Sequence, residues 1–371
     1  MRLGIDVSTY FEELEHGAQY FDGNKVVEPL SAFRQNGVDI MRIRVWVDPR
    51  GENGEPYLAG TCDTDNSVKL AQLAQQKGYK IMLDFHYSDF WCDPGKQFLP
   101  KKWRELSLEQ LVGEVYRYTV EVLRVSLTNC VEPEYIQVGN EITNGILWPV
   151  GQLQGGENGA ERENYEALCY LLKAGVRACR EICPNSKLML HLERSYDQQV
   201  YNEFFTNMEK YGVDYDVIGF SYYPCWHGTF EQLFANVNMC RKFGKEEMIV
   251  ETGYPFTGDD YVQNLDGDNH MCVAGNGLLP DSFSEEYPLT ANGQKKFLQK
   301  LLDQAEKHGV SAVCWWEPLW IPGENICWAS KAAQKYLHDE SKSTRNEWAN
   351  QCLFDYQGKK LPAFDIFKVS K

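Results

Sequence analysis

Positive charge and histidine are both scarce in this sequence. Its 371 residues include 37 lysines and arginines against 53 aspartates and glutamates, a formal net charge of −16, and they form no basic run. A chain of that sign repels a phosphate backbone, so we expect no nucleic-acid partner. The seven histidines contain neither a His-x-His pair nor a His-Glu-x-x-His helix. Because those are common ligand patterns of metal-dependent hydrolases, the sequence argues against metal-assisted hydrolysis.

Several signals of other functions and locations are missing as well. The sequence has no Gly-x-x-x-x-Gly-Lys phosphate loop, no dinucleotide-binding glycine fingerprint and no nucleophile elbow. No apolar run is long enough to cross a bilayer, so we expect no membrane association. Met1 is followed at once by a strand-like run, without a basic and apolar leader. We therefore expect a cytoplasmic protein, or a secreted one if a leader has been removed.

A repeated unit of amphipathic run, glycine and short apolar run fills most of the chain. The glycine marks a helix-to-strand junction, because it adopts the left-handed conformation of a helix C-terminus without strain. Five such glycines are Gly37, Gly78, Gly212, Gly244 and Gly309. The predicted strands cover residues 3–7, 40–46, 80–87, 134–141, 187–193, 217–223, 248–251 and 312–316. Eight strands alternating with helices predict a single (β/α)8 TIM barrel domain over residues 1–371, with extended βα loops.

Two local patterns support the barrel. Ser107 followed by Gln110 matches a capping box, and the apolar residues of 108–123 then fall on one helical face. A doubly wound open sheet is the rival fold, and it usually carries a Gly-rich phosphate loop after its first strand. Residues 7–11, Val-Ser-Thr-Tyr-Phe, contain no glycine. The sequence therefore favours the barrel.

The C-terminal ends of the predicted strands are polar, aromatic and rich in acids. In a (β/α)8 barrel this rim carries the catalytic groups. Its members are Asp6, Ser8, Arg44, Trp46, His86, Tyr87, Asn140, Glu141, His191, Glu193, Tyr222, Tyr223, Glu251, Trp316 and Glu317. A rim that only supported the fold would be more mixed in composition, so we interpret this one as a functional site.

Two glutamates on the rim, Glu141 and Glu251, each end an apolar run. An ionised carboxylate there is costly to desolvate unless it is paired, hydrogen-bonded or protonated. Either residue alone could be a strand-end cap or an ion-pair partner. Facing each other across a barrel mouth, they suit glycoside hydrolysis, in which one carboxyl protonates the leaving oxygen and the other attacks the anomeric carbon or activates water.

Tryptophan and tyrosine are abundant, with 10 and 21 residues. Indole rings stack on the flat apolar faces of sugars, so tryptophans in loops would suit a glycan-binding cleft. The loop tryptophans with neighbouring glycine or proline are Trp91, Trp103, Trp148, Trp226, Trp320 and Trp328. Several could equally pack loops against the barrel.

Six stretches of the rim carry a family resemblance. They are Gly4-Ile5-Asp6-Val7-Ser8, Met41-Arg42-Ile43-Arg44-Val45-Trp46, Leu83-Asp84-Phe85-His86-Tyr87-Ser88-Asp89-Phe90-Trp91, Val138-Gly139-Asn140-Glu141-Ile142, Glu251-Thr252-Gly253-Tyr254-Pro255 and Trp315-Trp316-Glu317-Pro318-Leu319-Trp320-Ile321-Pro322. Over nearly the whole chain they resemble glycoside hydrolase family 53, the arabinogalactan endo-β-1,4-galactanases. The Asn-Glu pair alone indicates only the wider clan of retaining barrel glycosidases, whereas the third and sixth stretches are more specific.

The resemblance implies a retaining hydrolase that cleaves β-1,4-galactosidic bonds in galactan, type I arabinogalactan or their oligosaccharides by double displacement. Glu141 is then the acid/base and Glu251 the nucleophile, with carboxyl oxygens roughly 5 Å apart. Asn140 would bind the sugar 2-hydroxyl, and Trp316 would form the floor of the subsite that holds the attacked sugar. His86 would contact hydroxyls of that sugar or orient another group.

Other residues are assigned to binding by the same resemblance or by their chemistry. We expect Arg44 and a hydroxyl of Tyr222 or Tyr223 to hold Glu251 in its ionised form. We assign Asp89, Trp91 and Trp320 to substrate binding. Two other functions stay open: another retaining β-1,4-glycanase of the clan, such as a mannanase or cellulase, or a barrel that binds glycans without catalysis. The presence of both glutamates disfavours the second.

The remaining predictions concern the substrate, the oligomeric state and bound ions. The partner is β-1,4-galactan or galacto-oligosaccharide, the chain is expected to be a monomer, and no cofactor is required for the chemistry. Segment 264–270 resembles the calcium-binding loop of bacterial family members, so Asp266, Asp268 and His270 would hold a structural Ca²⁺. A simple acidic turn would look the same.

The twelve cysteines are scattered, and Cys169, Cys179 and Cys314 fall inside predicted helices or strands. A buried free thiol there behaves as a small hydrophobe. Free thiols fit a reducing cytoplasm, where imported galacto-oligosaccharide would be the substrate more than polymer.

Overall fold

Eight parallel strands close into a barrel in the computed structural model, which describes residues 1–155, 162–262, 272–273, 279–340 and 342–367. Around the barrel the strands follow the order β1-β14-β13-β12-β11-β6-β5-β4. Their bounds are β1 (Arg2–Asp6), β4 (Ile40–Val45), β5 (Lys80–Phe85), β6 (Tyr135–Val138), β11 (Lys187–Leu192), β12 (Val217–Tyr222), β13 (Glu246–Thr252) and β14 (Ala312–Trp316). The predicted (β/α)8 barrel is confirmed.

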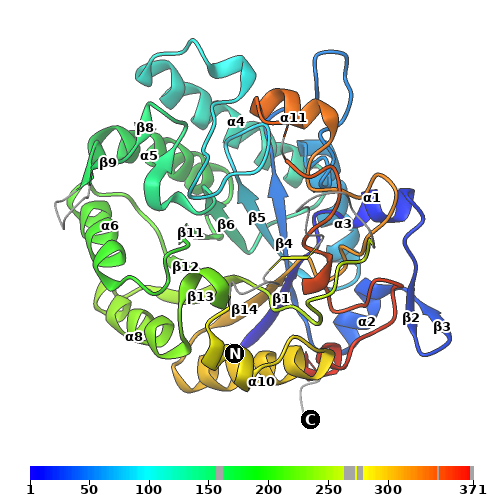
Figure 1. Cartoon of the computed structure of the whole chain (residues 1–371). Coiled ribbons are helices and arrows are strands. Elements are labelled where there is room, and N and C mark those ends of the chain that lie inside the picture. Colours follow the sequence, from blue (N-terminus) through cyan, green and yellow to red (C-terminus); the bar gives the residue numbers. More distant parts are fainter. Residues whose placement is uncertain (156–161, 263–271, 274–278, 341, 368–371) are drawn as a thin grey trace.

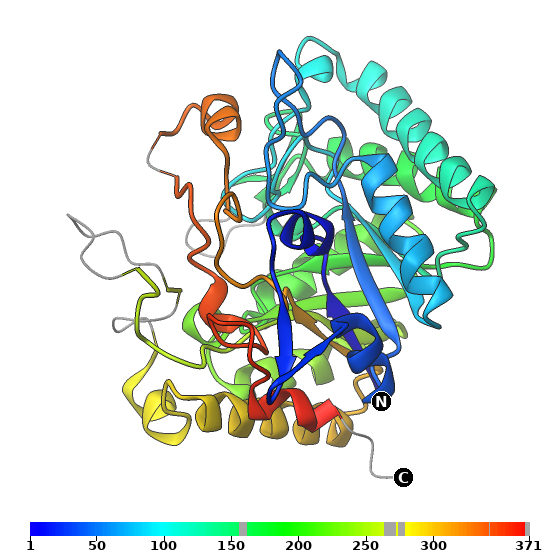
Figure 2. The ribbon, with the colours of Figure 1, turned by 90° about the vertical axis from the view of Figure 1, so that its right-hand side faces the viewer.

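Helices surround the barrel on the outside, as Figure 1 shows. They are α1 (Tyr10–Glu15), α2 (Pro29–Gln35), α3 (Thr64–Gln76), α4 (Leu108–Thr128), α5 (Tyr165–Ile182), α6 (Gln198–Lys210), α7 (Pro224–His227), α8 (Phe230–Cys240), α9 (Asp281–Glu286), α10 (Ala291–Lys307) and α11 (Lys331–Leu337). Short 3-10 helices cover Lys101–Trp103, Ile142–Asn144, Arg241–Phe243, Ala349–Gln351 and Pro362–Phe367. The last of these packs against α10 (Figure 2). None of the helices in the described residues is both long and apolar enough to span a membrane.

In the described part of the chain, three two-stranded sheets lie in the loops. They pair β2 (Tyr20–Asp22) with β3 (Lys25–Val27), β7 (Gly145–Ile146) with β8 (Gly151–Gln152), and β9 (Gln154–Gly155) with β10 (Arg162–Glu163). The last two pairs belong to the long connection from β6 to α5, so this βα loop is extended as predicted.

The predicted junctions have the expected backbone. Each of the five glycines between a helix and a strand is left-handed, with φ from 64° at Gly309 to 97° at Gly37. Helix α4 begins with the reciprocal capping box of Ser107 and Gln110. These local signals determine where helices stop and start, so the strands follow in the predicted order.

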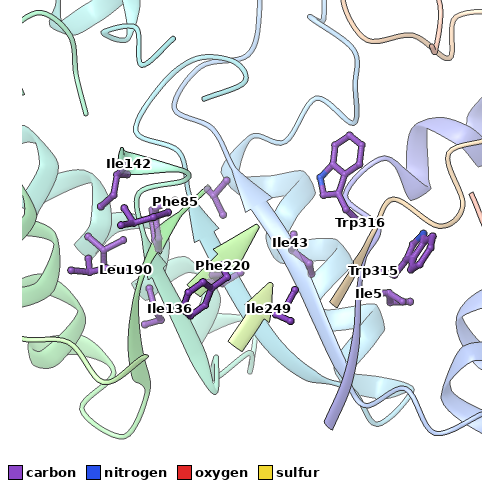
Figure 3. Close-up of a cluster of buried hydrophobic side chains, with 14 of the residues drawn as sticks. Ile5, Ile43, Phe85, Ile136, Ile142, Leu190, Phe220, Ile249, Trp315 and Trp316 are labelled. Atoms are coloured by element: carbon purple, nitrogen blue, oxygen red, sulfur yellow. The ribbon is translucent and has the colours of Figure 1, made fainter. Parts of the chain in front are cut away.

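The barrel interior has an apolar lower layer and a polar upper layer. Inward-facing residues near the strand starts form a compact apolar cluster that includes Ile40, Met82, Met189, Met248 and Cys314. Two residues further along three of these strands the inward residue is polar: Arg42 follows Ile40, Asp84 follows Met82 and His191 follows Met189. The outward faces pack under the helices in a larger cluster, part of which Figure 3 shows. The lower layer fills the barrel, so the polar upper layer forms a rigid floor for the rim.

Some strands end earlier than predicted, because the chain turns sharply at the rim. Tyr87, Glu141 and Glu317 all have left-handed backbones, with φ of 50°, 48° and 43°. A non-glycine residue rarely adopts this conformation, and such residues cluster at functional sites. The runs predicted as 80–87 and 134–141 therefore leave the sheet at Phe85 and Val138.

Candidate active site

A cavity of about 460 Å³ opens at the C-terminal ends of the barrel strands. Eight predicted site residues line it: Arg44, His86, Trp91, Asn140, Glu141, Tyr223, Glu251 and Trp316. Ten further residues line it: Glu193 was on the predicted rim, Trp226 and Trp328 were among the loop tryptophans, and Cys92, Asp93, Pro94, Arg194, Tyr196, His227 and Trp348 were not singled out from sequence. In Figure 3, Trp316 extends above the packed core at the upper end of its strand.

The two glutamates face each other inside this cavity. A carboxylate oxygen of Glu141 and one of Glu251 lie within 4.8 Å of each other, and both side chains are buried. Glu141 reaches the cavity through its left-handed turn after β6. Glu251 does so because the pairing of β13 with both neighbours shifts register beside it, and such a bulge re-aims a side chain. The separation matches the expected 5 Å.

Arg42, and not Arg44, pairs with Glu251. The Nη2 atom of Arg42 lies 2.8 Å from Glu251 Oε1, and the same guanidinium contacts Asp6 and Asp84, each at 2.8 Å. Arg44 instead pairs with Asp6 at 3.1 Å and Glu317 at 2.6 Å. The prediction that Arg44 holds Glu251 is therefore wrong. Both arginines point inward from β4, but Arg42 is one layer deeper, at the level of the Glu251 carboxylate.

Arg44 still has a place at the cavity wall. Its guanidinium lies 4.2 Å from the ring centroid of Trp91, within the range of a cation–π contact. It also donates to the carbonyl oxygen of Ala59 at 3.3 Å. Arg44 therefore positions Trp91 and links the cavity to the loop after β4.

Replacing Arg42 with methionine should strongly destabilise the protein, because the buried carboxylates of Asp84 and Glu251 would lose their arginine and Asp6 would keep only Arg44. We expect a loss of about 3–5 kcal/mol in the free energy of unfolding, the range for breaking buried ion pairs. Arg42 lowers the pKa values of Asp84 and Glu251, so both pKa values would rise in the folded variant, and the loss should be smaller at pH 5 and larger at pH 8. Urea unfolding at both pH values measures this.

Arg117 provides the matched control for that substitution. It is an exposed arginine on α4 that also pairs with two acids, Glu114 and Glu121. Because water already solvates these charges, Arg117→Met should change stability by about 0.5 kcal/mol or less at either pH. Equal losses in the two variants would contradict the proposed dependence on burial.

Tyr223 contacts Glu251, whereas Tyr222 does not belong to the site. The hydroxyl of Tyr223 lies 3.5 Å from Glu251 Oε2. Tyr222 points to the helical side of β12, where it stacks on Phe297 and donates to the carbonyl oxygen of Gly228 at 3.2 Å. Neighbouring residues alternate between the two faces of a strand, so only one of this pair could face the cavity. The assignment of Tyr222 is wrong.

Burial and neighbouring charges give the two glutamates different pKa values. Burial raises the pKa of Glu141 well above its ordinary value, and the carboxylates of Glu251 and Glu193 raise it further. Burial also raises the pKa of Glu251, to about 7, although the Arg42 guanidinium opposes this shift. Glu251 is therefore the member of the pair that loses its proton first, and Glu141 the member that keeps it.

A hydrogen-bonded chain supports Glu141 from below; of its members, His191 was on the predicted rim, whereas Ser221 was not predicted from sequence. Ser221 Oγ donates to Glu141 Oε1 at 2.6 Å, and His191 Nε2 lies 2.8 Å from the same hydroxyl. All three residues are buried. Their inward register on β11 and β12 was the available signal, since Ser221 precedes Tyr223 by two residues on its strand.

His86 lies at the cavity wall with both ring nitrogens occupied. Its Nδ1 accepts from the backbone N–H of Cys92 at 3.0 Å, so the ring proton is on Nε2, 3.0 Å from Asp84 Oδ2. Of the two roles considered for His86, orientation of neighbouring groups fits this geometry better than binding to hydroxyls. Asn140 is held by Arg42 and by the carbonyl oxygen of Cys92, and it faces the cavity beside Glu141.

Two residues assigned to substrate binding lie behind the cavity wall. Trp320 is fully buried and packs on Trp316 and Trp91, with ring centroids 5.7 and 6.0 Å away. Asp89 is fully buried and accepts from the backbone N–H of Lys101 at 2.7 Å, which holds the loop after β5. Neither lines the cavity, so the assignment of both residues to substrate binding is wrong. They support the cavity wall from behind. The sequence does not indicate whether such a side chain lines the cavity or lies behind its wall.

The predicted ligands of calcium, Asp266, Asp268 and His270, lie outside the described residues. Within those residues, Glu141, Glu251 and His191 have oxygen and nitrogen atoms close enough to share one cation. Both nitrogens of His191 are engaged, however, Nδ1 with Gln137 at 3.0 Å and Nε2 with Ser221. The arrangement therefore fits a carboxylate pair better than a metal centre.

Comparison with known proteins agrees with this geometry. The profile described as Glycosyl hydrolase family 53 matches residues 2–367. An endo-β-1,4-galactanase of Bacillus subtilis is 30% identical, over 99% of this chain and 85% of its own. The solved GH53 catalytic domain of Ignisphaera aggregans is 33% identical with a TM-score of 0.86, covering 98% of this chain and 94% of its own. A chain from a study of two fungal β-1,4-galactanases is 26% identical with a TM-score of 0.76, covering 99% and 98%.

Proposed function

The chain belongs to glycosyl hydrolase family 53, and we propose that it is an endo-β-1,4-galactanase that hydrolyses galactan with retention of anomeric configuration. The galactanase relatives support the substrate. The observation that carries the mechanism is the separation of at most 4.8 Å between carboxylate oxygens of Glu141 and Glu251. An inverting enzyme keeps its carboxyl groups roughly 6.5–9.5 Å apart to admit a water, whereas a retaining pair is closer.

The two glutamates divide the steps of a double displacement. In the first step, a carboxylate oxygen of Glu251 attacks the anomeric carbon, the bond to the leaving sugar breaks, and the proton of Glu141 passes to the leaving oxygen. In the second step, ionised Glu141 takes a proton from water while the water oxygen attacks the same carbon. The bond to Glu251 breaks, and both glutamates return to their starting states.

The cavity walls supply the binding groups for the attacked sugar. Trp316 lies next to Glu251 in the barrel order and offers an indole face as the floor of that subsite. The free amide hydrogen of Asn140 is available to the sugar 2-hydroxyl, where hydrogen bonds strengthen in the transition state. Tyr223 and Arg42 both donate toward Glu251, and they stabilise its carboxylate when the glycosyl bond breaks.

A panel of polysaccharides tests the substrate. Reducing-end release from β-1,4-galactan, with little from mannan, xylan or cellulose, is the expected result. Activity confined to any of the other three would make the chain another glycanase of the clan. Binding of galactan without release of reducing ends would make it a glycan-binding barrel.

The pH dependence of kcat/KM should be bell-shaped, because the two glutamates must be in opposite protonation states. Glu251 must be ionised, so activity should rise through an acidic limb centred near pH 7, the raised pKa of this group in the free enzyme. Glu141 must be protonated, so activity should fall on a basic limb at higher pH. The limbs report the pair and not isolated residues. Initial rates on galactan from pH 4 to 10 measure this, and a single-limb profile would contradict it.

Two further expectations belong to this proposal. All twelve cysteines lie in the described part of the chain and each is free, which supports a reducing cytoplasm as the location; cell fractionation tests this. A structural Ca²⁺ on Asp266, Asp268 and His270 rests on their sequence alone. Thermal unfolding with added calcium and with a chelator tests it.

A further inference from the structure

The hydrogen bonds that run from His191 through Ser221 to Glu141 have a definite direction of donation. His191 Nδ1 lies 3.0 Å from Gln137 Nε2, 3.0 Å from Asn140 Oδ1 and 3.4 Å from the backbone nitrogen of Glu141. The backbone N–H of Glu141 is directed at Nδ1, and Asn140 Oδ1 already accepts from Arg42 at 2.7 Å and Gln137 at 3.1 Å, so Nδ1 accepts. Burial lowers the pKa of His191 well below its ordinary value, so the ring is neutral and its one proton is on Nε2.

The direction continues through Ser221 to the carboxyl group. The Nε2 proton of His191 points to Ser221 Oγ at 2.8 Å, which occupies a lone pair of the hydroxyl. The single hydroxyl proton of Ser221 is then directed to Glu141 Oε1 at 2.6 Å. In a protonated carboxyl group the carbonyl oxygen is the better acceptor, so Oε1 is the carbonyl oxygen and the acid proton belongs on Oε2.

We propose that Ser221 and His191 are positioning residues that hold the catalytic proton of Glu141 on Oε2, the oxygen left free to face the leaving group. The inference rests on the proposed function, because it gives Glu141 the acid role. Ser221 is paired in register with Glu251 on the neighbouring strand. The same hydroxyl therefore fixes one carboxyl beside the other, and the acid cannot rotate its proton toward the nucleophile.

Other ionisable groups influence Glu141 and His191, the two ends of this hydrogen-bonded series. Glu141 is influenced by Glu251, Glu193, Arg42 and Lys96. His191 is influenced by Arg42, Asp84, His86 and His227. A substitution at Ser221 changes none of these groups, so a change in the titration of Glu141 would report the lost hydroxyl itself.

The test compares Ser221→Ala with wild type on two substrates. Galactan has a basic leaving group that needs the proton, whereas a dinitrophenyl β-galactobioside does not. We expect kcat/KM to fall about tenfold or more on galactan, a fraction of the 10²–10⁴-fold of general acid catalysis, and less than about threefold on the aryl substrate. The hydroxyl donor favours ionised Glu141, so its loss raises the pKa of Glu141 and the basic limb should move to higher pH.

Thr252→Val is the matched control. Thr252 is a fully buried rim residue whose hydroxyl donates to the carbonyl oxygen of Tyr222 at 2.7 Å and touches neither glutamate. It should change both substrates by the same factor and leave the basic limb in place. A fraction of unfolded enzyme lowers all rates equally, so the ratio between substrates is independent of folding yield.

Three outcomes decide the matter. A galactan-selective loss with a shifted basic limb supports the positioning chain. Equal losses on both substrates, or an unmoved basic limb, overturn it while leaving the proposed function intact. Wild-type enzyme that turns over the aryl galactobioside but not galactan overturns the proposed substrate, and the basic limb of Ser221→Ala on the polysaccharide that the wild type does cleave then decides the role of Ser221.

Discussion

Glu251→Ala should abolish turnover of every substrate, by about 10⁵-fold or more, on the scale seen when a catalytic nucleophile is removed. The covalent step needs this carboxylate whatever group departs. Removing it leaves a space beside Arg42 and Tyr223, the two groups that now face its oxygens. Azide or formate should occupy that space, because an anion there regains the ion pair with Arg42.

Added azide should then restore part of the activity with a changed product. Azide attacks the anomeric carbon from the side of the missing carboxylate, the glycosidic bond breaks, and Glu141 protonates the leaving oxygen. The galactosyl azide formed has inverted configuration, which proton NMR of the product identifies. Rescue with retention of configuration would mean that residue 251 is not the nucleophile.

Glu141→Ala should reduce activity unevenly across substrates. On galactan, whose leaving sugar is a strong base, we expect a loss of about 10³-fold or more, within the range of general acid catalysis. On a dinitrophenyl β-galactobioside the glycosyl-enzyme should still form, since that leaving group needs no proton. The second step now lacks its base, so a rapid burst of dinitrophenol should precede slow turnover. Stopped-flow absorbance measures the burst.

Azide separates this variant from the nucleophile variant. It should accelerate the second step of Glu141→Ala by attacking the glycosyl-enzyme, and the product should have retained configuration. If Glu141→Ala lost as much rate on the activated substrate as on galactan, or if azide gave an inverted product, the roles of the two glutamates would have to be exchanged.

The barrel and the carboxylate pair could be predicted because their signals are local. A left-handed glycine such as Gly78 ends a helix through its own backbone, and a glutamate such as Glu141 stands out at the end of an apolar run. Neither inference needs knowledge of what lies across the barrel. The strand order then follows from βα alternation.

The wrong predictions concern how deep a side chain lies in the barrel and which face of its strand it is on. Both properties depend on the whole barrel. Arg42 and Arg44 share one face of one strand, and only the level of Glu251 on the opposite side decides which of them contacts it. Tyr222 and Tyr223 differ only in facing, which depends on where β12 enters the barrel. Trp320 is of a residue type that often binds sugars, but its ring packs against Trp91 behind the cavity wall.

The polar upper layer of the barrel also bears on how this enzyme can change over time. Arg42 is shared by three buried carboxylates, so replacing one of these charged groups would leave uncompensated charge and cost about 3–5 kcal/mol of stability. The cavity lip is different, since Trp226 and Tyr196 line the site yet remain 42% and 40% exposed. Variation can accumulate there one residue at a time, so new glycan preferences are accessible through the lip while the hydrolytic chemistry stays constant.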